Sequence, residues 1–201
     1  MGISPQEFAQ LQQRLSGKTR KRAEALPSVV TGKLHHRRVL GVDPSLRGTG
    51  YGVIEFGTPG PVALTHGTIR CPPGWERSRC LGHIAATLRE VIRAHQPEVC
   101  AVEGLFHARN LRTALIMGEA RGAALASVAE AGLGVFELAP RKVKLAIVGF
   151  GGAQKLAVAK MVQRMLALAE LPAADAADAL AIALAFAQER NRTGLGQPAR
   201  V

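Results

Sequence analysis

The stretch that most constrains this chain lies near its carboxyl end, where residues 175–187 read DAADALAIALAFA. Residues three apart are neighbours on a helix of 3.6 residues per turn, so Asp175 and Asp178 share one face of the predicted helix. Every later residue in the stretch is Ala, Leu, Ile or Phe, which predicts a buried helix with a polar start. The free N–H groups of a helix start stabilise one carboxylate, but a second carboxylate repels the first. An acidic helix cap thus explains one Asp, and the second makes a metal or substrate site the alternative that the rest of the chain must decide.

Hydrophobic patterning along the rest of the chain predicts an α/β protein. Strands are predicted at residues 37–43, 51–56, 62–70, 98–103 and 134–138. Helices are predicted at residues 76–95, 110–131, 140–147, 154–169 and 173–189. The second and third strands are expected to pair antiparallel, and the fourth to lie beside the first and parallel to it. The expected fold is a mixed five-stranded sheet flanked by helices.

Two of the predicted strands end on an acid, the first on Asp43 and the fourth on Glu103. The carboxyl ends of neighbouring parallel strands meet at one edge of a sheet, which is where open α/β sheets bind their ligands. The last helix can bring Asp175 and Asp178 to the same edge. Four carboxylates in one place need a compensating cation, and hard oxygen ligands in that number favour Mg²⁺ or Mn²⁺. The residues therefore predict a divalent metal site.

The composition excludes several classes of protein. A chain of 201 residues, 47% of them hydrophobic, can bury a core as a single domain, yet no apolar run is long enough to span a membrane. Residues 1–15 contain no apolar signal core, and Gln6 stands where myristoylation needs Ser or Thr. Three cysteines without a CxxC pair support neither a disulfide framework nor a zinc site, so a reducing, cytoplasmic compartment is expected.

The net charge of +11 indicates a polyanionic partner, and most of it lies towards the ends of the chain. Residues 1–38 hold eight Lys or Arg against two Glu, and residues 191–201 add two Arg. Residues 1–36 are therefore interpreted as a basic extension without a stable fold until it meets phosphate, and 191–201 as a basic tail. The folded domain would be residues 37–190. The alternative is that basic tails merely aid solubility.

Five separate motifs resemble one known family in order and spacing. They are VLGVDPSLRGTGYGVI (39–54), AVEGLF (101–106), ALIMGEARG (114–122), PRKVKLAIVGFGGAQK (140–155) and ADAADALAIA (174–183). Together they resemble the RuvC Holliday-junction resolvases, bacterial endonucleases with the ribonuclease H-like fold. The resemblance covers about residues 38–188, which makes it far more specific than any single short motif.

The resemblance implies roles for particular residues of this chain. The four metal-binding acids of the family fall on Asp43, Glu103, Asp175 and Asp178, two functional lysines on Lys144 and Lys155, and the aromatic residue near the crossover on Phe106. From the residues themselves, the neighbouring His107, Arg109 and Arg112 are candidate phosphate contacts, with exposed polarity as the alternative. For Phe106 the alternative is ordinary packing, and for the two lysines it is a solvated helix face.

The implied activity is hydrolysis of phosphodiesters by a two-metal endonuclease that uses Mg²⁺, with Mn²⁺ as the alternative ion. Resolving a four-way DNA junction takes two symmetric cuts, so a homodimer is expected, with the Gly- and Ala-rich helix at 114–126 as a candidate interface. The family resemblance also implies the RuvAB branch-migration complex as a partner.

Two departures and three rival functions bear on this interpretation. Ser45 stands where the family usually has glycine, which would be strained if the position needs a positive φ, and residues 1–36 lie outside the resemblance. The loop 149–155 is not a phosphate-binding P-loop, because Gln154 and Leu156 replace its glycine and hydroxyl residues. The rivals are an actin-like phosphotransferase, which needs two such lobes, a non-catalytic nucleic-acid-binding module, and a ribonuclease H-like RNA-processing nuclease.

Overall fold

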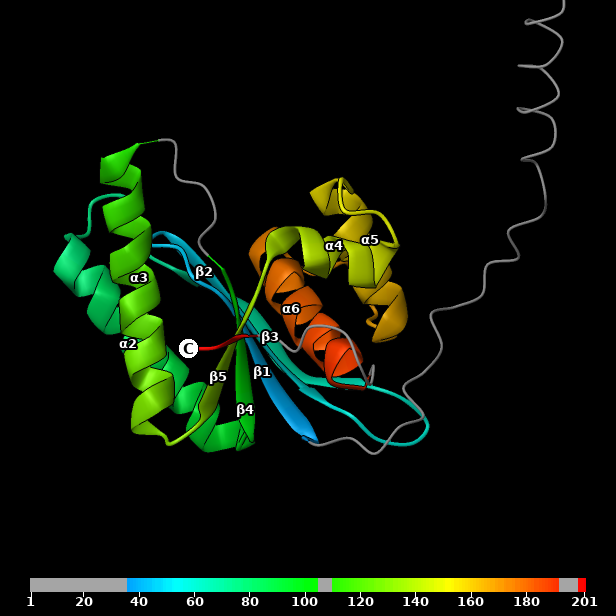
Figure 1. Cartoon of the computed structure of the whole chain (residues 1–201). Helices are drawn as coiled ribbons and strands as arrows, with labels where there is room; N and C mark the ends of the chain where they lie inside the picture. Colours follow the sequence, from blue (N-terminus) through cyan, green and yellow to red (C-terminus); the bar gives the residue numbers. More distant parts are fainter. Residues whose placement is uncertain (1–35, 105–109, 192–198) are drawn as a thin grey trace, which may run out of the picture. The chain divides into compact units, whose positions relative to one another are not determined.

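The computed structural model describes residues 36–104, 110–191 and 199–201, which all belong to one compact unit spanning residues 32–201 (Figure 1). The strands are β1 (Arg38–Asp43), β2 (Gly48–Glu55), β3 (Val62–Arg70), β4 (Val99–Glu103), β5 (Gly134–Leu138) and β6 (Ala199–Arg200). The helices are α2 (Arg77–His95), α3 (Leu111–Glu130), α4 (Pro140–Val148), α5 (Lys155–Met165) and α6 (Ala174–Asn191). The five strands and five helices predicted from residue 37 onwards are all confirmed.

The largest difference in a boundary is the end of α5, at Met165 rather than at residue 169. Ala167 takes a positive φ of 49°, a backbone conformation that ends a right-handed helix. The apolar spacing continues past this point in the sequence, so periodicity alone predicts a helix that is too long.

The strands form one mixed sheet in the order β3-β2-β1-β4-β5-β6. β1 pairs antiparallel with β2 and parallel with β4, with Val39 opposite Val99 and Val42 opposite Val102, so the predicted neighbours are correct. The sixth strand was not predicted. β6 is only two residues long, is exposed, and pairs antiparallel with β5. A strand of that length has no alternating pattern that a sequence could display.

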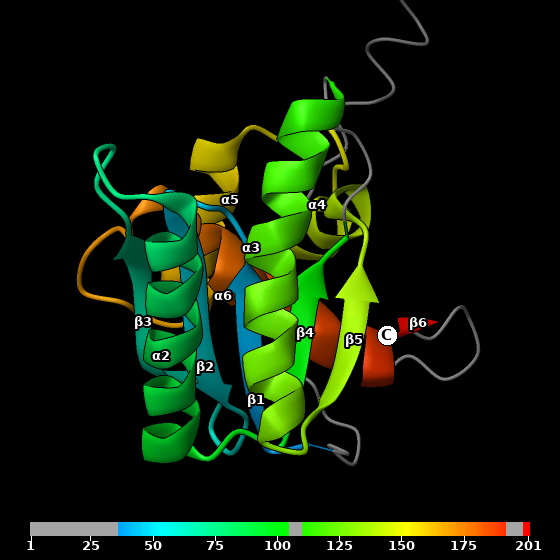
Figure 2. The same ribbon diagram turned by 90° about the vertical axis from the view of Figure 1, so that its left-hand side faces the viewer.

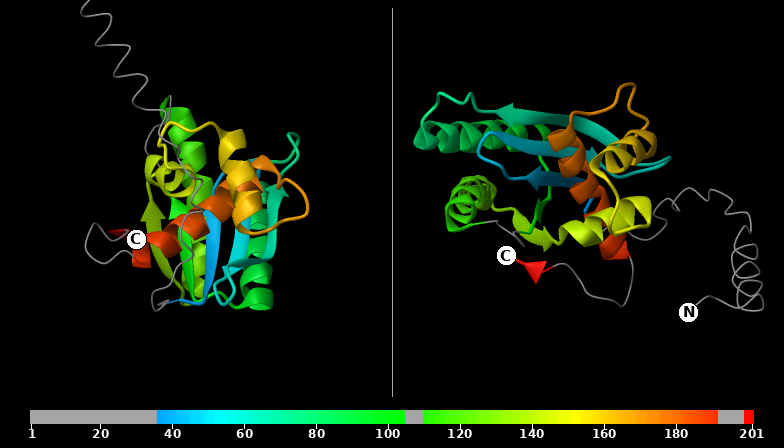
Figure 3. Two further views of the ribbon diagram at one scale, coloured as in Figure 1. Left: turned by 90° about the vertical axis from the view of Figure 1, so that its right-hand side faces the viewer. Right: turned by 90° about the horizontal axis from the view of Figure 1, so that it is seen from above.

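Helices cover both faces of the sheet. Figure 2 shows α2 and α3 in front of the sheet and α6 behind it, and Figure 3 shows α4 and α5 on the same side as α6. The strands alternate between two cores: Val39 and Ala101 pack on the α4–α6 side, whereas Leu40, Val42 and Cys100 pack on the α2–α3 side. This is the period of two expected of strands that are buried on both faces.

Helix α6 lies unusually close to β1 and β2. A Cβ atom added at Gly41 would lie 2.0 Å from the Ala179 carbonyl oxygen, and one added at Gly50 would lie 1.9 Å from the Asp175 carbonyl oxygen. Both clashes are with backbone, which cannot move aside without moving the helix. Glycine at these two positions therefore lets the start of α6 rest directly on the strands, beside the carboxyl end of β1.

Candidate active site

Four acidic side chains meet at one edge of the sheet. Asp43 is the last residue of β1 and Glu103 the last residue of the parallel neighbour β4, and their carboxyl groups are hydrogen-bonded to each other. Asp175 and Asp178 lie in the first turns of α6, and the charges of both act on Asp43. The close approach of α6 to β1 and β2 thus brings together residues more than 130 positions apart in the sequence.

Burial and mutual repulsion make this cluster hard to ionise. Burial raises the pKa of Glu103 from 4.5 to about 8, and the charge of Asp43 and the hydrogen bond to it add to the rise. Burial also raises the pKa of Asp43, from 3.8 to about 6, and the charges of Asp178 and Asp175 raise it further. A cation bound by the two carboxyl groups would compensate the repulsion between their charges.

Among the described residues, Lys155 supplies a positive charge that acts directly on these acids. It is the first residue of α5, and its Nζ donates to Asp178 Oδ2 at 2.6 Å. The hydrogen bond to Asp178 raises the pKa of Lys155, and the charge of Lys155 in turn lowers the pKa of Asp43 and of Glu103. The Lys155 side chain is 68% exposed, so solvent screens the pair and the ammonium can leave it at little cost.

The donor set suits a hard divalent cation in type and in charge. Four carboxylates, two of them with raised pKa values, form an anionic group that one lysine does not neutralise. Across the described parts of the chain, no three acidic, histidine or cysteine side chains already enclose a position for an ion. Lys155 is hydrogen-bonded to Asp178, and its charge also acts on Asp43 and Glu103. These residues are suitable ligands for Mg²⁺ or Mn²⁺, and their carboxylates would move closer together to bind the ion.

The remaining predicted residues fall in different places. Lys144 is half-buried on α4. Arg112 is exposed in the first turn of α3. Asn110 caps that helix, because its side chain accepts a hydrogen bond from the Thr113 N–H. The predicted contacts Phe106, His107 and Arg109 lie outside the described residues.

The turn that follows Asp43 is fixed by its own side chains. The Thr49 hydroxyl donates to the Ser45 carbonyl oxygen at 2.6 Å and accepts from the Ser45 N–H at 3.2 Å. Among the described non-glycine residues, positive φ occurs at Gln96 and Ala167 and not at Ser45. Serine in place of glycine is therefore unstrained here, and the turn holds Asp43 at the end of β1 without a glycine.

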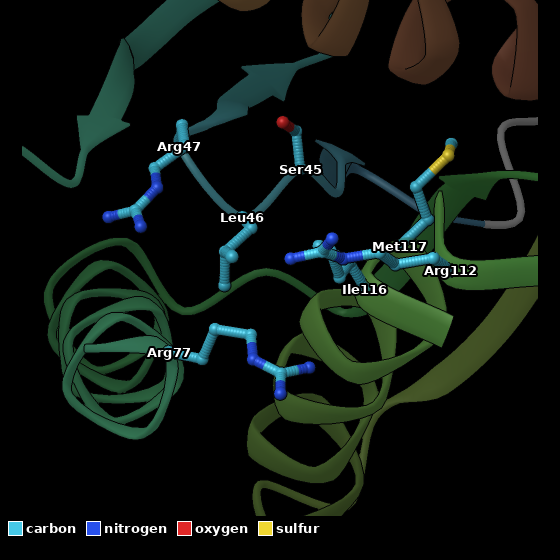
Figure 4. Close-up of a pocket in the computed structure, with 7 residues that line it drawn as sticks. All are labelled: Ser45, Leu46, Arg47, Arg77, Arg112, Ile116 and Met117. Carbon is cyan, nitrogen blue, oxygen red and sulfur yellow. The ribbon is translucent and has the colours of Figure 1, made fainter. Parts of the chain in front are cut away.

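A cavity of about 450 Å³ opens beside this turn, between the starts of α2 and α3 (Figure 4). Its lining residues are Ser45, Leu46, Arg47, Arg77, Arg112, Ile116 and Met117. Arg47 is occupied by the carbonyl oxygens of Pro72 and Trp75, and Arg77 pairs with Glu119 at 3.1 Å. The sequence motifs pointed to Arg112 but not to Arg47 or Arg77, because only the fold brings the starts of two helices to the turn.

The raised pKa values predict that the metal-free protein becomes less stable as pH rises. Between pH 4.5 and about 8, folded Glu103 retains a proton that the unfolded chain has released, so folding is disfavoured at higher pH. Mg²⁺ held by these carboxylates would take the place of that proton. We expect the rise in melting temperature caused by Mg²⁺, relative to EDTA, to be larger at about pH 8.5 than at about pH 5.5. In the Glu103→Gln variant the difference should shrink, and equal Mg²⁺ effects at both pH values in the unmodified chain would contradict the assignment.

A model of the family described as crossover junction endodeoxyribonuclease RuvC matches residues 39–186. The chain belongs to the RuvC family. The RuvC enzyme of Halorhodospira halophila is 47% identical over 154 residues, which are 77% of this chain and 92% of that relative. The RuvC enzyme of Hyphomonas neptunium is also 47% identical, over 75% of this chain and 90% of its own length.

Solved structures agree with this assignment. T. thermophilus RuvC in complex with a Holliday junction substrate superposes with a TM-score of 0.75 at 35% identity, over 83% of this chain and all of that one. The yeast mitochondrial Holliday junction resolvase Ydc2 is 14% identical and superposes with a TM-score of 0.54. At this identity the match shows a similar fold and nothing more. The predicted ribonuclease H-like class, with a mixed sheet flanked by helices, is confirmed.

Proposed function

We propose that this chain resolves four-way DNA junctions by paired, symmetric hydrolytic nicks. The observation that carries the proposal is the convergence of four acids from β1, β4 and α6 at one sheet edge, with the pKa of two of them raised. Membership of a family of junction endonucleases defines the substrate class. A pure binding module would have no use for buried acids that repel the phosphate backbone.

Nucleases of this family depend on divalent metal ions in general. Here Asp43, Glu103, Asp175 and Asp178 would hold the metal, for which we propose two Mg²⁺ per subunit, with Mn²⁺ as a substitute. Bound there, the ions would activate water and stabilise the charge that develops on the oxygens of the phosphodiester. Asp43, between β4 and α6, is the candidate to contact both ions.

Lys155 and Lys144 would place positive charge near the scissile phosphate without holding it in one fixed orientation. Lys155 pairs with Asp178 through an exposed ammonium, so it is free to move towards a phosphate once a cation takes over the carboxylate. Lys144 on α4 is proposed for the same task. We further propose that Phe106 stacks on an unpaired base near the crossover and that His107 and Arg109 contact phosphates.

Arg112 at the cavity rim is proposed as a phosphate contact. We expect Arg112→Gln to weaken junction binding several-fold and to reduce the slope of log affinity against log salt by about 1, because one phosphate contact is lost. The matched control is Arg93→Gln, an exposed arginine in the last turn of α2, at the other end of that helix from the cavity. An unchanged salt slope for Arg112→Gln, measured by fluorescence anisotropy from about 50 to 200 mM salt, would remove Arg112 from the DNA surface.

Two symmetric cuts require two copies of the site, so we propose a two-fold homodimer. Helix α3 is the candidate interface, since it carries Leu111 and Leu115 at 77% and 58% exposure beside its small residues.

RuvAB is the proposed partner and the cytoplasm the proposed location. None of the described helices is long and apolar enough to cross a membrane. Residues 1–36 and 191–201 are proposed as basic segments that contact the DNA backbone outside the nuclease domain.

The substrate test compares a mobile four-way DNA junction, a linear duplex of the same sequence and an RNA hairpin, each with Mg²⁺ and with EDTA. Paired Mg²⁺-dependent nicks at symmetric positions of the junction alone are expected. Junction binding without cutting in any divalent metal would reduce the function to a binding module. Cutting of the RNA hairpin with an intact junction would move the protein to RNA processing.

A further inference from the structure

Arg121 lies in the middle of α3 and, at 8% exposure, is the one charged residue classed as buried in the part of the chain that the structure describes. Its Nη1 donates to the Glu103 carbonyl oxygen at 2.5 Å, and its Nη2 donates to Glu137 Oε2 at the same distance. Glu137 lies on β5, the strand beside β4. One guanidinium thus joins a helix to the ends of two neighbouring strands, at the residue that carries a proposed metal ligand.

The backbone at the end of β4 is held from two sides. On the side of β5, the Gly104 N–H donates to the Leu138 carbonyl oxygen at 2.9 Å. On the side of α3, Arg121 donates a hydrogen bond to the Glu103 carbonyl oxygen. Strand pairing ends at this residue, so Arg121 provides the hydrogen-bond donor that a buried carbonyl group needs. The Glu103 carbonyl group and the Gly104 N–H belong to the same planar peptide unit, so the two hydrogen bonds fix the orientation of the backbone directly after the Glu103 Cα atom. They thereby restrict the direction in which the Glu103 side chain leaves the backbone.

The charge of Arg121 is directed away from that carboxyl group. Its partners are the Glu137 carboxylate and the main-chain oxygen of Glu103. The charged groups that shift the pKa of the Glu103 carboxyl group are instead Asp43, Asp178 and Lys155. A buried guanidinium needs a counter-ion, and Glu137 provides it at 31% side-chain exposure. The pair therefore fixes Glu103 in space without neutralising it, which leaves its carboxylate available to a metal.

We propose that Arg121, together with Glu137, is a positioning residue for Glu103 that sets the geometry of the metal site. This inference rests on the proposed function, in which Glu103 binds metal. Arginine suits the task because its planar fork donates two hydrogen bonds in different directions, whereas lysine would keep the charge and reach only one partner in a fixed geometry. Residues that orient metal ligands in this way typically change metal affinity or activity about 10–100-fold when replaced.

The test is the affinity of the full-length protein for Mn²⁺, measured by electron paramagnetic resonance, alongside the Mg²⁺ concentration that half-saturates junction cleavage. We expect Arg121→Lys to raise the Mn²⁺ dissociation constant and the half-saturating Mg²⁺ concentration about 10–100-fold, with cleavage recovering at high Mg²⁺. Glu137→Gln, which keeps a hydrogen-bond acceptor but removes the charge, should have a smaller effect in the same direction. If Arg121→Lys does not fold, the metal affinity of Glu137→Gln tests the positioning role instead.

The matched control is Arg89→Lys. Arg89 also joins α3 to a neighbouring element, through a two-point pair with Glu130, but both groups are exposed and lie away from the acids. Its metal dependence should equal that of the unmodified chain. Lowered thermal stability in Arg121→Lys with unchanged Mn²⁺ affinity and unchanged Mg²⁺ dependence would overturn the proposal, since Arg121 would then serve folding alone.

Glu103→Gln separates this outcome from failure of the proposed function. If Glu103→Gln abolishes Mn²⁺ binding while Arg121→Lys leaves it intact, the positioning role fails and the metal site stands. If Glu103→Gln leaves Mn²⁺ binding unchanged, Glu103 is not a ligand, and the positioning role of Arg121 falls with the metal site.

Discussion

Replacing Asp43 with asparagine is expected to lower junction cleavage on the order of 10³-fold or more, while junction binding stays close to that of the unmodified chain. Asp43 is flanked by Glu103 and Asp178, and asparagine keeps its shape but loses the charge that a cation needs. Phosphate contacts elsewhere are untouched, so binding should survive. Cleavage is measured in single turnover with saturating Mg²⁺, and binding in Ca²⁺ or EDTA.

The same substitution carries a prediction of opposite sign for stability. Because burial and neighbouring carboxylates raise the pKa of Asp43, its ionised form is disfavoured in the folded chain. The neutral amide removes this repulsion, so Asp43→Asn should melt at the same temperature as the unmodified chain or higher in EDTA. Glu98→Gln is the control, an exposed acid that precedes β4 at the end opposite Glu103. Retained cutting in Asp43→Asn would remove Asp43 from the mechanism.

Replacing Gly50 with alanine is expected to cost both stability and activity. The added Cβ would lie 1.9 Å from the Asp175 carbonyl oxygen, so the start of α6 must move away from β2. Overpacking of this kind typically destabilises by about 1–3 kcal/mol. A shift of about 1 Å in Asp175 and Asp178 is enough to lower cleavage about 10²-fold.

Gly82→Ala is the matched control for Gly50→Ala. Gly82 lies on the exposed face of α2 with nothing within 4 Å of an added Cβ, so alanine there should raise stability by up to about 1 kcal/mol. Urea unfolding monitored by circular dichroism compares the two variants. Wild-type stability and cleavage in Gly50→Ala would contradict the close contact between α6 and the sheet.

Much of the fold could be predicted because each element carries its own pattern. Strand β1 is apolar and buried from Val39 to Val42 and ends on Asp43, as a buried parallel strand does, and α2 shows helical spacing along its length. The rule that places a crossover strand beside its parallel partner then puts Glu103 next to Asp43. The meeting of these acids follows from local patterns and one topological rule.

Other features depend on contacts that leave no local pattern. Strand β6 is made by two residues, and its pairing with β5 comes from backbone hydrogen bonds alone. The burial of Arg121 depends on partners 16 and 18 residues away, Glu137 and Glu103. The available signal was one arginine within the Gly- and Ala-rich stretch 114–126 of this helix. Small residues there indicated close packing, but only the fold shows that the arginine is what the packing encloses.

The account depends most on the four acids forming the metal centre, and anomalous scattering from crystals soaked in Mn²⁺ tests this directly. We predict an anomalous peak among Asp43, Glu103 and the start of α6, with Lys155 Nζ displaced from Asp178. Mn²⁺ bound elsewhere, with no peak among these carboxylates and the lysine still paired with Asp178, would contradict the account.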